Sequence, residues 1–299
     1  MTVSHKITPH LWFDKEAKAA AEFYVASLPQ SAITRLTVLR DTPSGDCDLL
    51  AFELAGQPFQ AISAGPYFTL NPSVSFVLHC STVAEVDALW ARLGDGGQAL
   101  MPLDAYPFSP RFGWMQDRFG VSWQVMLAES PAGAAQIIVP SLMFTGDNFG
   151  KAQEAINFYT AIFPNSASGQ VQINPGTPGN ADAGSVLTAN FALAGQWFAI
   201  SDSGYAHGFN FNEAVSFIVS CESQAEVDYY WAHLSAVPEA EQCGWLKDKY
   251  GLSWQIVPTA MDALMREGSP AQVASVTQAF LPMKKLDIAT LERAYHAAA

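Results

Sequence analysis

The chain is poor in positive charge: its 299 residues include 15 Lys and Arg against 28 Asp and Glu, a formal net charge of −13. Proteins that bind nucleic acids or anionic membranes use Lys and Arg to neutralise phosphates, so this balance argues against both kinds of partner. We attribute the acidity to solubility. Because 49% of the residues are hydrophobic and only 14% are charged, the composition indicates large cores, and the length indicates two domains.

Long apolar runs and closely paired cysteines are also missing. No run of about 18 apolar residues is present, so we expect no membrane-spanning helix. Residues 1–8 lack the basic and apolar segments of a signal peptide. The cysteines show no CxxC spacing, and we expect reduced, mostly buried thiols in a cytoplasmic protein: Cys47, Cys80, Cys221 and Cys243.

What the chain does contain is a twelve-residue stretch that occurs twice. Residues 113–124 and 244–255 are identical at seven of the twelve positions. Asp117 and Gly120 take the first and last positions of a predicted four-residue turn, where Asp caps backbone amides and Gly tolerates the exit geometry. After the turn, apolar and polar residues alternate, which predicts a strand with an apolar face and a second face that carries Gln124. Such a strand is typical of a cavity wall.

The repeat extends over most of the chain, because residues 78–87 match residues 219–228 and other segments match in the same order. Insertions and deletions in loops explain why the spacing between matched segments varies. We therefore predict two tandem units, over residues 1–129 and 139–260, joined by a linker over residues 130–138. A C-terminal helical extension follows over residues 261–299.

Each unit has the element order βαβββ, twice. In the first unit, extended patterns predict strands at residues 7–13, 33–40, 49–54, 58–63 and 74–80. The second helix of each unit begins with an S/T-x-x-E capping box, at Thr82 and at Ser223. Two more helices are predicted after the repeat, one from Ser269 and one over residues 286–295, and we expect them to pack on the second unit or on the interface.

These motifs resemble the vicinal-oxygen-chelate superfamily of glyoxalase I, bleomycin-resistance proteins and extradiol dioxygenases. Within it, the chain resembles the PhnB-like family, often described as 3-demethylubiquinone-9 3-methyltransferase. The segments that carry the resemblance are residues 7–13, 23–29, 111–124, 158–166, 243–258 and 283–288. The resemblance implies an α+β fold of tandem glyoxalase domains: four βαβββ modules form curved mixed sheets, each unit is a half-open cup, and C-terminal helices follow.

The resemblance also implies where a metal ion would bind. In metal-using members, four inward-facing strand positions supply His, Glu or Gln. In the first unit the four positions fall on Thr8, near Ala61, on Val74 and on Gln124. His10 lies on the same strand face as Thr8. In the second unit they fall on or near Val139, Ile200, Val215 and Gln255. A neutral amide alone holds a divalent ion poorly, so we expect neither a metal nor another cofactor. One alternative stays open, a poor site made by His10, Gln124 and an outside group.

Other candidate site residues follow from their positions. Cys243 could be a thiol that lines the second cup, with His207 as its base, or a small residue packed at a strand start. Asp202 ends a strand and could reach the cup mouth. The description as a methyltransferase implies a glycine-rich turn between a strand and a helix, but Gly94–Gly97 follows a helix and is interpreted as its end. Four tryptophans and three phenylalanines could line apolar cups: Trp12, Trp114, Trp197, Trp245, Phe68, Phe209 and Phe211.

Two functions of different class follow. The first is binding of a small, mostly apolar molecule in the cup, without the usual metal, with candidate residues His10, Trp12, Trp114, Gln124, Asp202, Cys243, Trp245 and Gln255. The alternative is an enzyme of the glyoxalase or dioxygenase superfamily or, by family description, a 3-demethylubiquinone-9 3-methyltransferase. Relatives that carry a single domain often assemble as homodimers, so we expect the two units to pair within the chain, and a homodimer of the whole chain stays open.

Overall fold

The computed structural model describes residues 5–128, 136–176 and 182–298, so residues 130–135 of the predicted linker lie outside it. The strands are β1 (Ile7–Phe13), β2 (Ala32–Thr42), β3 (Gly45–Leu54), β4 (Gln57–Ser63), β5 (Val74–Cys80), β6 (Gln98–Tyr106), β7 (Ser109–Gln116), β8 (Ser122–Leu127), β9 (Ile138–Phe144), β10 (Ala167–Ile173), β11 (Val186–Leu193), β12 (Gln196–Asp202), β13 (Val215–Cys221), β14 (Trp245–Lys247) and β15 (Ser253–Pro258).

The helices are α1 (Ala17–Ser27), α2 (Val83–Leu93), α3 (Ala152–Ile162), α4 (Gln224–Leu234), α5 (Thr259–Glu267), α6 (Pro270–Phe280) and α7 (Ile288–Ala297). Within the described residues, short 3-10 helices lie at Gly146–Asn148 and Pro238–Ala240. Among the described residues, no helix combines the length and apolarity that crossing a bilayer requires. The chain is therefore an α+β protein, as predicted.

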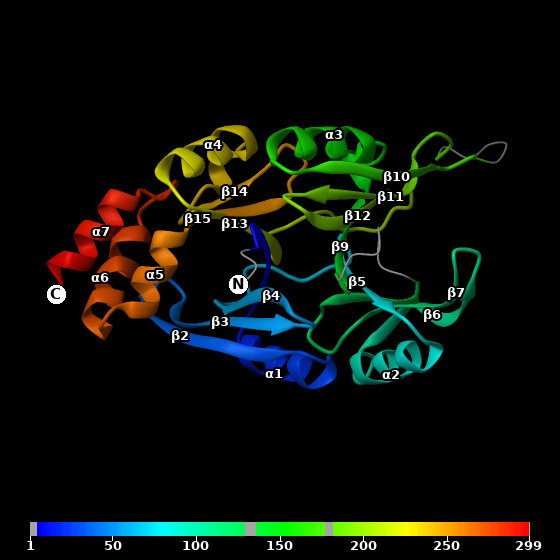
Figure 1. The fold of residues 1–299 in the computed structure, drawn as a ribbon, viewed down its shortest axis with the longest axis horizontal. Coiled ribbons are helices and arrows are strands. Elements are labelled where there is room, and N and C mark those ends of the chain that lie inside the picture. Colours follow the sequence, from blue (N-terminus) through cyan, green and yellow to red (C-terminus); the bar gives the residue numbers. More distant parts are fainter. Residues whose placement is uncertain (1–4, 129–135, 177–181, 299) are drawn as a thin grey trace.

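The strands form two mixed sheets, and each sheet takes one module from each half of the chain (Figure 1). Sheet A has the order β14-β15-β13-β1-β4-β3-β2, and sheet B has the order β10-β11-β12-β9-β5-β8-β7-β6. The first strands of the modules join the halves, because β1 pairs antiparallel with β13 and β5 pairs antiparallel with β9. The structure thus differs from the expectation that each unit would form its own sheet.

The fourth module is shorter than the other three. In sheet B, β6 and β7 form a long hairpin beside β8, whereas β14 is a three-residue strand at the edge of sheet A. The short helix Pro238–Ala240 occupies the part of this module where the repeat predicts a strand. Sheet A therefore has seven strands and sheet B eight.

Helices cover one face of each sheet, which we call its outer face. Helices α1 and α4 pack on sheet A, and α2 and α3 pack on sheet B. On this face, alternate strand residues such as Leu11 of β1 and Phe217 of β13 join one hydrophobic core, which the two sheets and their helices share. The intervening residues project to the opposite face, which we call the inner face. Amides join the sheets as well: the Gln57 side chain donates to the carbonyl of Ile138 at 2.9 Å and accepts from its N–H at 2.8 Å.

The repeated turn forms as predicted in both halves. Asp117 accepts hydrogen bonds from the backbone N–H groups of Phe119 and Val121, and its other oxygen accepts from the indole N–H of Trp123 at 2.8 Å. Gly120 has φ +89°, which a side chain would disfavour. Asp248 makes the equivalent bonds in the second half. The aspartates are therefore structural, and each ties a turn to the strand that follows it.

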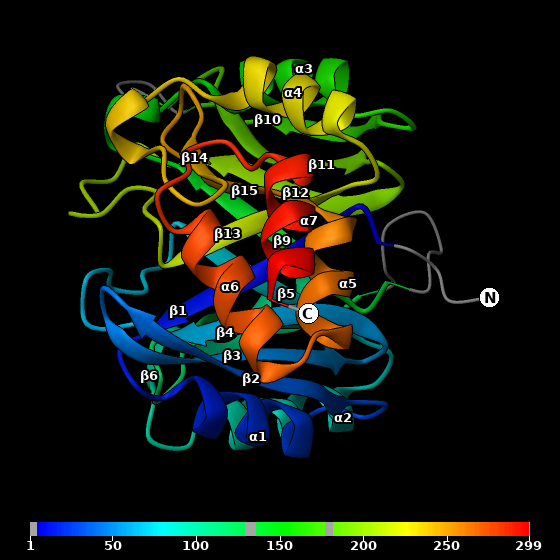
Figure 2. The same ribbon diagram turned by 90° about the vertical axis from the view of Figure 1, so that its left-hand side faces the viewer.

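The C-terminal helices pack on the inner face of sheet A (Figure 2). Four buried residues of the extension form one cluster with residues of the sheet: Val276, Phe280, Leu286 and Leu291 with Leu39, Cys47 and Ala64. Trp12, Leu49 and Ile62 pack against this cluster. Helix α5 was not predicted, because no side-chain cap marks its start at Pro258. Helix α6 begins with the capping box of Ser269 and Gln272. The extension thus packs mainly on the strands that the first half of the chain contributes to sheet A.

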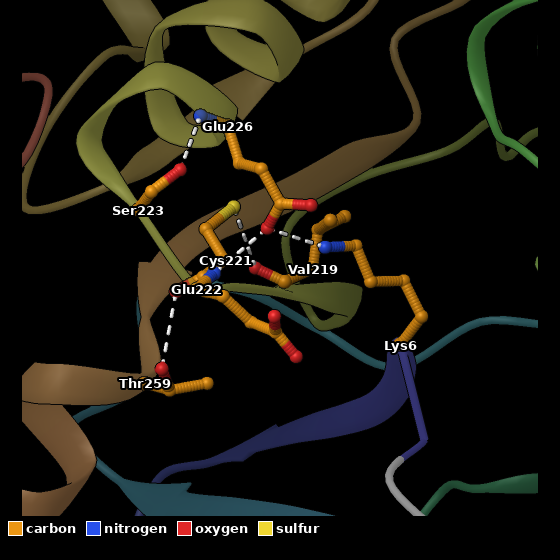
Figure 3. Close-up of polar contacts among 7 residues, drawn as sticks. All are labelled: Lys6, Val219, Cys221, Glu222, Ser223, Glu226 and Thr259. Carbon is orange, nitrogen blue, oxygen red and sulfur yellow. Dashed lines mark hydrogen bonds and ion pairs between the residues drawn. The ribbon is translucent and has the colours of Figure 1, made fainter.

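Polar contacts fix the start of this extension beside the N-terminal strand (Figure 3). The carboxylate of Glu226 in α4 accepts from Lys6 at 2.8 Å and from the N–H of Glu222 at 2.7 Å. The hydroxyl of Thr259, the first residue of α5, donates to the carbonyl of Cys221 at 3.3 Å. Both ends of the repeat therefore meet at the ends of neighbouring interior strands of sheet A, β1, β13 and β15.

Candidate functional site

A row of polar side chains crosses the inner face of sheet A. Hydrogen-bonded register partners project to the same face of a sheet. Register pairs link Lys247 to Ser253, Ser253 to Ser216, Ser216 to His10 and His10 to Gln60. The row therefore runs through β14, β15, β13, β1 and β4, and we call these five residues the polar row: Lys247, Ser253, Ser216, His10 and Gln60.

Aromatic rings lie against the middle of the polar row. The indole of Trp245 meets the imidazole of His10 edge to face, with ring centroids 5.3 Å apart, and lies 5.9 Å from Trp12. Trp12 in turn contacts Phe68 at 5.0 Å and Tyr67 at 6.4 Å. Because Tyr67 is 65% exposed, the aromatic cluster reaches from the buried row to the molecular surface.

Two atoms of the polar row are buried without a hydrogen-bond partner. His10 is 2% exposed and Ser253 is 1% exposed. His10 Nδ1 and Ser253 Oγ have no partner in the described part of the chain. Ser216, which lies between them, is satisfied because its Oγ accepts from Gln255 Nε2 at 3.0 Å. Burial lowers the pKa of His10 to about 3, so the imidazole is neutral at physiological pH.

Both cationic side chains near the row are already paired. Lys247 forms an ion pair with Glu213 at 2.8 Å, and the two side chains are 23% and 19% exposed. Arg35 of β2 continues the row beyond Gln60 through Ala51 and pairs with Asp262 of α5. The site therefore presents hydrogen-bonding groups and aromatic surface but no unpaired charge among these residues.

The corresponding row of sheet B is chemically simpler. Gln116 is in register with Ser122, and Ser75 with Ser141 and Ala199, while Ser75 and Ser122 each precede a residue of the register pair Phe76 and Trp123. Ser141 therefore stands where sheet A has His10. Two of its serines accept hydrogen bonds: Trp114 Nε1 donates to Ser122 Oγ and Gln124 Nε2 donates to Ser75 Oγ, both at 2.8 Å. The unsatisfied atoms and the histidine are therefore features of sheet A alone in this comparison.

The structure divides the predicted site residues between the two sheets. His10, Trp12, Trp245 and Gln255 gather on the inner face of sheet A, and Trp114 and Gln124 lie on sheet B. His10 and Gln124 consequently cannot share a metal site, and that alternative is wrong. The physical reason is the pairing of β1 with β13, which places Gln255 rather than Gln124 near His10.

Asp202 does not point to a cup mouth. Its Oδ1 accepts from the N–H groups of Gly150 and Ala152 at 2.9 and 3.2 Å, and its Oδ2 accepts from that of Val186 at 2.9 Å. Burial raises the pKa of Asp202, although these backbone hydrogen bonds oppose the rise. In sheet A, Ser63 does the same for the start of α1 by accepting from Ala17 N–H at 3.1 Å. Asp202 is therefore a cap for α3.

Cys243 lies at the margin of the site as a protonated thiol. Its Sγ donates to the carbonyl of Leu281 at 3.2 Å, and burial raises its pKa to about 11. His207, the proposed base, instead contacts the hydroxyl of Ser203 at 2.7 Å and stacks on Phe209. Since the thiolate is the nucleophile and neither group serves the other, nucleophilic catalysis by this pair does not fit the geometry.

The residues of the inner face do not fit the superfamily's metal. Among the described residues, no group of three or more His, Cys, Asp or Glu lies close enough together to hold an ion. On sheet A, His10 is accompanied by hydroxyls and by the amide of Gln255, which is committed to Ser216. Divalent ions bound by imidazole usually take further nitrogen, thiolate or carboxylate ligands, and this donor set offers none.

Sequence analysis missed Ser216, Ser253, Lys247 and Gln60. Ser253 and Lys247 have the same period-two phase as the candidates Gln255 and Trp245, whereas Ser216 and Gln60 directly neighbour Val215 and Ala61 and have the opposite phase. The period of side chains along a strand indicates which residues share a face. It does not give the register across strands, because the register depends on which modules pair.

Comparison with known proteins places the chain in a family. No curated protein matches it. The PhnB protein from Bacillus cereus, a provisional 3-demethylubiquinone-9 3-methyltransferase, is 36% identical over 42% of this chain and 100% of that one, with a TM-score of 0.39. Glyoxalase I from Zea mays is 10% identical over 87% of this chain and 97% of that one, with a TM-score of 0.52, which shows the shared fold.

A Bacillus subtilis protein with a provisional dioxygenase assignment is also similar in fold, at 10% identity, 83% and 84% coverage and a TM-score of 0.50. The sequence profile of the family described as 3-demethylubiquinone-9 3-methyltransferase matches twice, over residues 5–126 and 136–257. The predicted resemblance is thereby confirmed. The chain belongs to the 3-demethylubiquinone-9 3-methyltransferase family, with two tandem copies of its glyoxalase-type fold.

Proposed function

We propose that this protein binds a small, mostly apolar molecule on the inner face of sheet A, at the polar row, without the superfamily's usual metal. The observation that carries the proposal is His10 Nδ1, a buried polar atom without a partner among aromatic rings. A buried polar group without a partner costs about 1–3 kcal/mol. A hydroxyl or carbonyl of a bound molecule would remove that cost.

The difference between the two sheets supports this choice of face. At matched positions, sheet A has His10, Gln60 and Lys247 where sheet B has Ser141, Ala199 and Gln116. Duplicated modules that serve only the fold have no need of such a difference. Aromatic rings with a few convergent polar groups are the usual lining of a small-molecule site.

The C-terminal helices would give this site its enclosure. They bury the apolar row next to the polar row, where Trp12 is in register with Ile62 and Ile62 with Leu49. An enclosed apolar face favours a ligand that is itself mostly apolar, because burial of its surface supplies most of the binding free energy.

The enzymatic alternative has less support from these residues. A general base works best with a pKa near the working pH, and His10 lies far below it at about 3. For methyl transfer, the glycine-rich segment at Gly94–Gly97 follows α2, and Gly94 is the C-cap of that helix. It therefore lacks the strand-to-helix context of a methyl-donor site.

A thermal-shift screen tests the proposal, with a library of aromatic compounds and antibiotics of different charge. His10→Ala is compared with Ser141→Ala, which changes the matched position of sheet B. We expect at least one compound class to raise Tm for the wild type and for Ser141→Ala but not for His10→Ala. If no compound stabilises the wild type, or if every shift survives in His10→Ala, the proposal is overturned.

A further inference from the structure

Two equivalent tryptophans of the repeat adopt different arrangements in this one chain. Trp114 is in register with Gln124, and Trp245 is in register with Gln255, so both start from the same position of their sheets. Trp114 donates from its indole N–H to Ser122 Oγ at 2.8 Å. The matching hydroxyl, Ser253 Oγ, has no partner within the described residues.

Trp245 instead turns its ring toward His10. Strand β14 is separated from β1 by β15 and β13, so the two side chains meet above the intervening strands, with their ring centroids 5.3 Å apart. The indole therefore lies across the polar row, which carries Ser253 on β15 and Ser216 on β13. This arrangement leaves His10 Nδ1 and Ser253 Oγ both buried and both without a partner.

We propose that Trp245 holds the place of the ligand's ring against His10, and that the ligand is an uncharged, bicyclic aromatic molecule with a hydroxyl or carbonyl group for His10 Nδ1. When the ligand enters, the indole turns so that its N–H donates to Ser253 Oγ, as Trp114 does to Ser122. This inference rests on the proposed function. It specifies the class of ligand and identifies the Trp245 indole as the group that the ligand displaces.

The charges around the row explain why the ligand is uncharged. Lys247 is neutralised by Glu213, and Arg35 by Asp262. His10 is neutral, because burial lowers its pKa to about 3. A charged ligand would place an unpaired charge in a buried site, which is strongly unfavourable. A neutral hydroxyl or carbonyl needs only one hydrogen bond.

The size of the ligand follows from what it replaces. The indole is a flat bicyclic ring that contacts both His10 and Trp12 edge to face. A bicyclic ligand recovers those contacts when the indole leaves. Its polar group then satisfies His10 Nδ1, and the displaced indole satisfies Ser253 Oγ. The bound state thus pairs two atoms that the present arrangement leaves unpaired.

The test uses 2-naphthol as the probe and the full chain labelled with 5-fluorotryptophan. Fluorine NMR reports each indole, and Trp245→Phe assigns the resonance of Trp245. We expect 2-naphthol to bind, to shift the Trp245 resonance and to leave that of Trp114 in place. Naphthalene-2-carboxylate, which is charged, is expected to bind at least tenfold more weakly.

A pair of matched variants tests the turned indole. Ser253→Ala removes the acceptor that the displaced indole needs, so the Kd for 2-naphthol rises by roughly five- to tenfold. Ser122→Ala, the same change on sheet B, leaves that Kd unchanged.

Four results would overturn the inference. If 2-naphthol binds in a manner that depends on His10 while the Trp245 resonance stays still, the indole is not displaced, and the proposed function survives. If Ser253→Ala binds 2-naphthol like the wild type, the indole does not turn to that hydroxyl. If 2-naphthol fails to bind, or if the carboxylate binds as tightly, the ligand class is wrong. The proposed function itself fails only when no compound of any charge shows binding that depends on His10.

Discussion

Asp248 accepts a hydrogen bond from the phenol of Tyr159 at 2.7 Å, which joins the last turn of the repeat to helix α3. The same carboxylate oxygen accepts from the indole N–H of Trp254 at 2.9 Å, and the other oxygen accepts from the N–H groups of Tyr250 and Leu252. Asp248 is completely buried. One acidic side chain therefore satisfies four donors from the turn, the following strand and a helix.

Replacement of this carboxylate by an amide should destabilise the fold. In Asp248→Asn, one acceptor oxygen becomes an NH2 group that faces donors, and we expect the free energy of unfolding to fall by about 2–4 kcal/mol. Urea unfolding followed by circular dichroism measures the change. Asp287→Asn is the control, because Asp287 is an exposed N-cap of α7 and Asn caps helices equally well. An Asp248→Asn protein as stable as the control would contradict this account of the turn.

The two serines at matched positions of the polar rows should respond oppositely to substitution by alanine. Ser253→Ala removes a buried hydroxyl without a partner, so the free energy of unfolding should rise by about 1 kcal/mol. Ser122→Ala removes the acceptor of the Trp114 indole, so it should fall by about 1 kcal/mol. Denaturant midpoints at equal m-values give both numbers. Equal losses in the two variants would mean that Ser253 has a partner in solution.

His10 should not titrate in the physiological range. Burial lowers its pKa from 6.5 to about 3, so the folded protein keeps it neutral while the unfolded chain protonates it below pH 6.5. The stability that neutral His10 contributes is therefore fully present above pH 6.5 and is lost as the pH falls toward 3. Relative to His10→Phe, the wild type should lose up to about 1.4 kcal/mol per pH unit in that window.

The imidazole resonance of His10 gives a second measurement. Its chemical shift should stay constant from pH 8 to pH 4, with His10→Phe used for assignment. A midpoint near 6.5 would show that solvent reaches the ring, and it would remove the basis for the unsatisfied nitrogen.

The C-terminal extension should contribute strongly to stability through its buried leucines. Leu291 of α7 is fully buried in the cluster on the inner face of sheet A. We expect Leu291→Ala to lower the free energy of unfolding by about 2–4 kcal/mol, by lost burial and by the cavity that remains. Leu187→Ala, at a residue that is 51% exposed, should change it by less than about 0.5 kcal/mol. Similar small effects at both sites would mean that α7 is only loosely attached.

Local signals predicted local structure well. The phase of apolar residues in β1 and β8, and the turn from Asp117 to Gly120, follow from side-chain period and turn chemistry, which act within a few residues. The same signals do not indicate how modules pair, because β1 has the same alternation of apolar and polar residues whether it pairs with β5 or with β13. Asp202 was misinterpreted for a related reason: a carboxylate at a strand end has no visible partner until α3 is in place.

The pairing of modules across the two halves also has a consequence for synthesis of the chain. In sheet A, Ile7 is in register with Val219, whereas in sheet B, Leu78 is in register with Ile138. More than two hundred residues separate the first pair, and at about 5–20 residues per second β1 waits roughly 10–40 s for β13 to leave the ribosome. Sheet B can form its central pair much earlier. The central pair of sheet A is therefore expected to form later during synthesis than the central pair of sheet B.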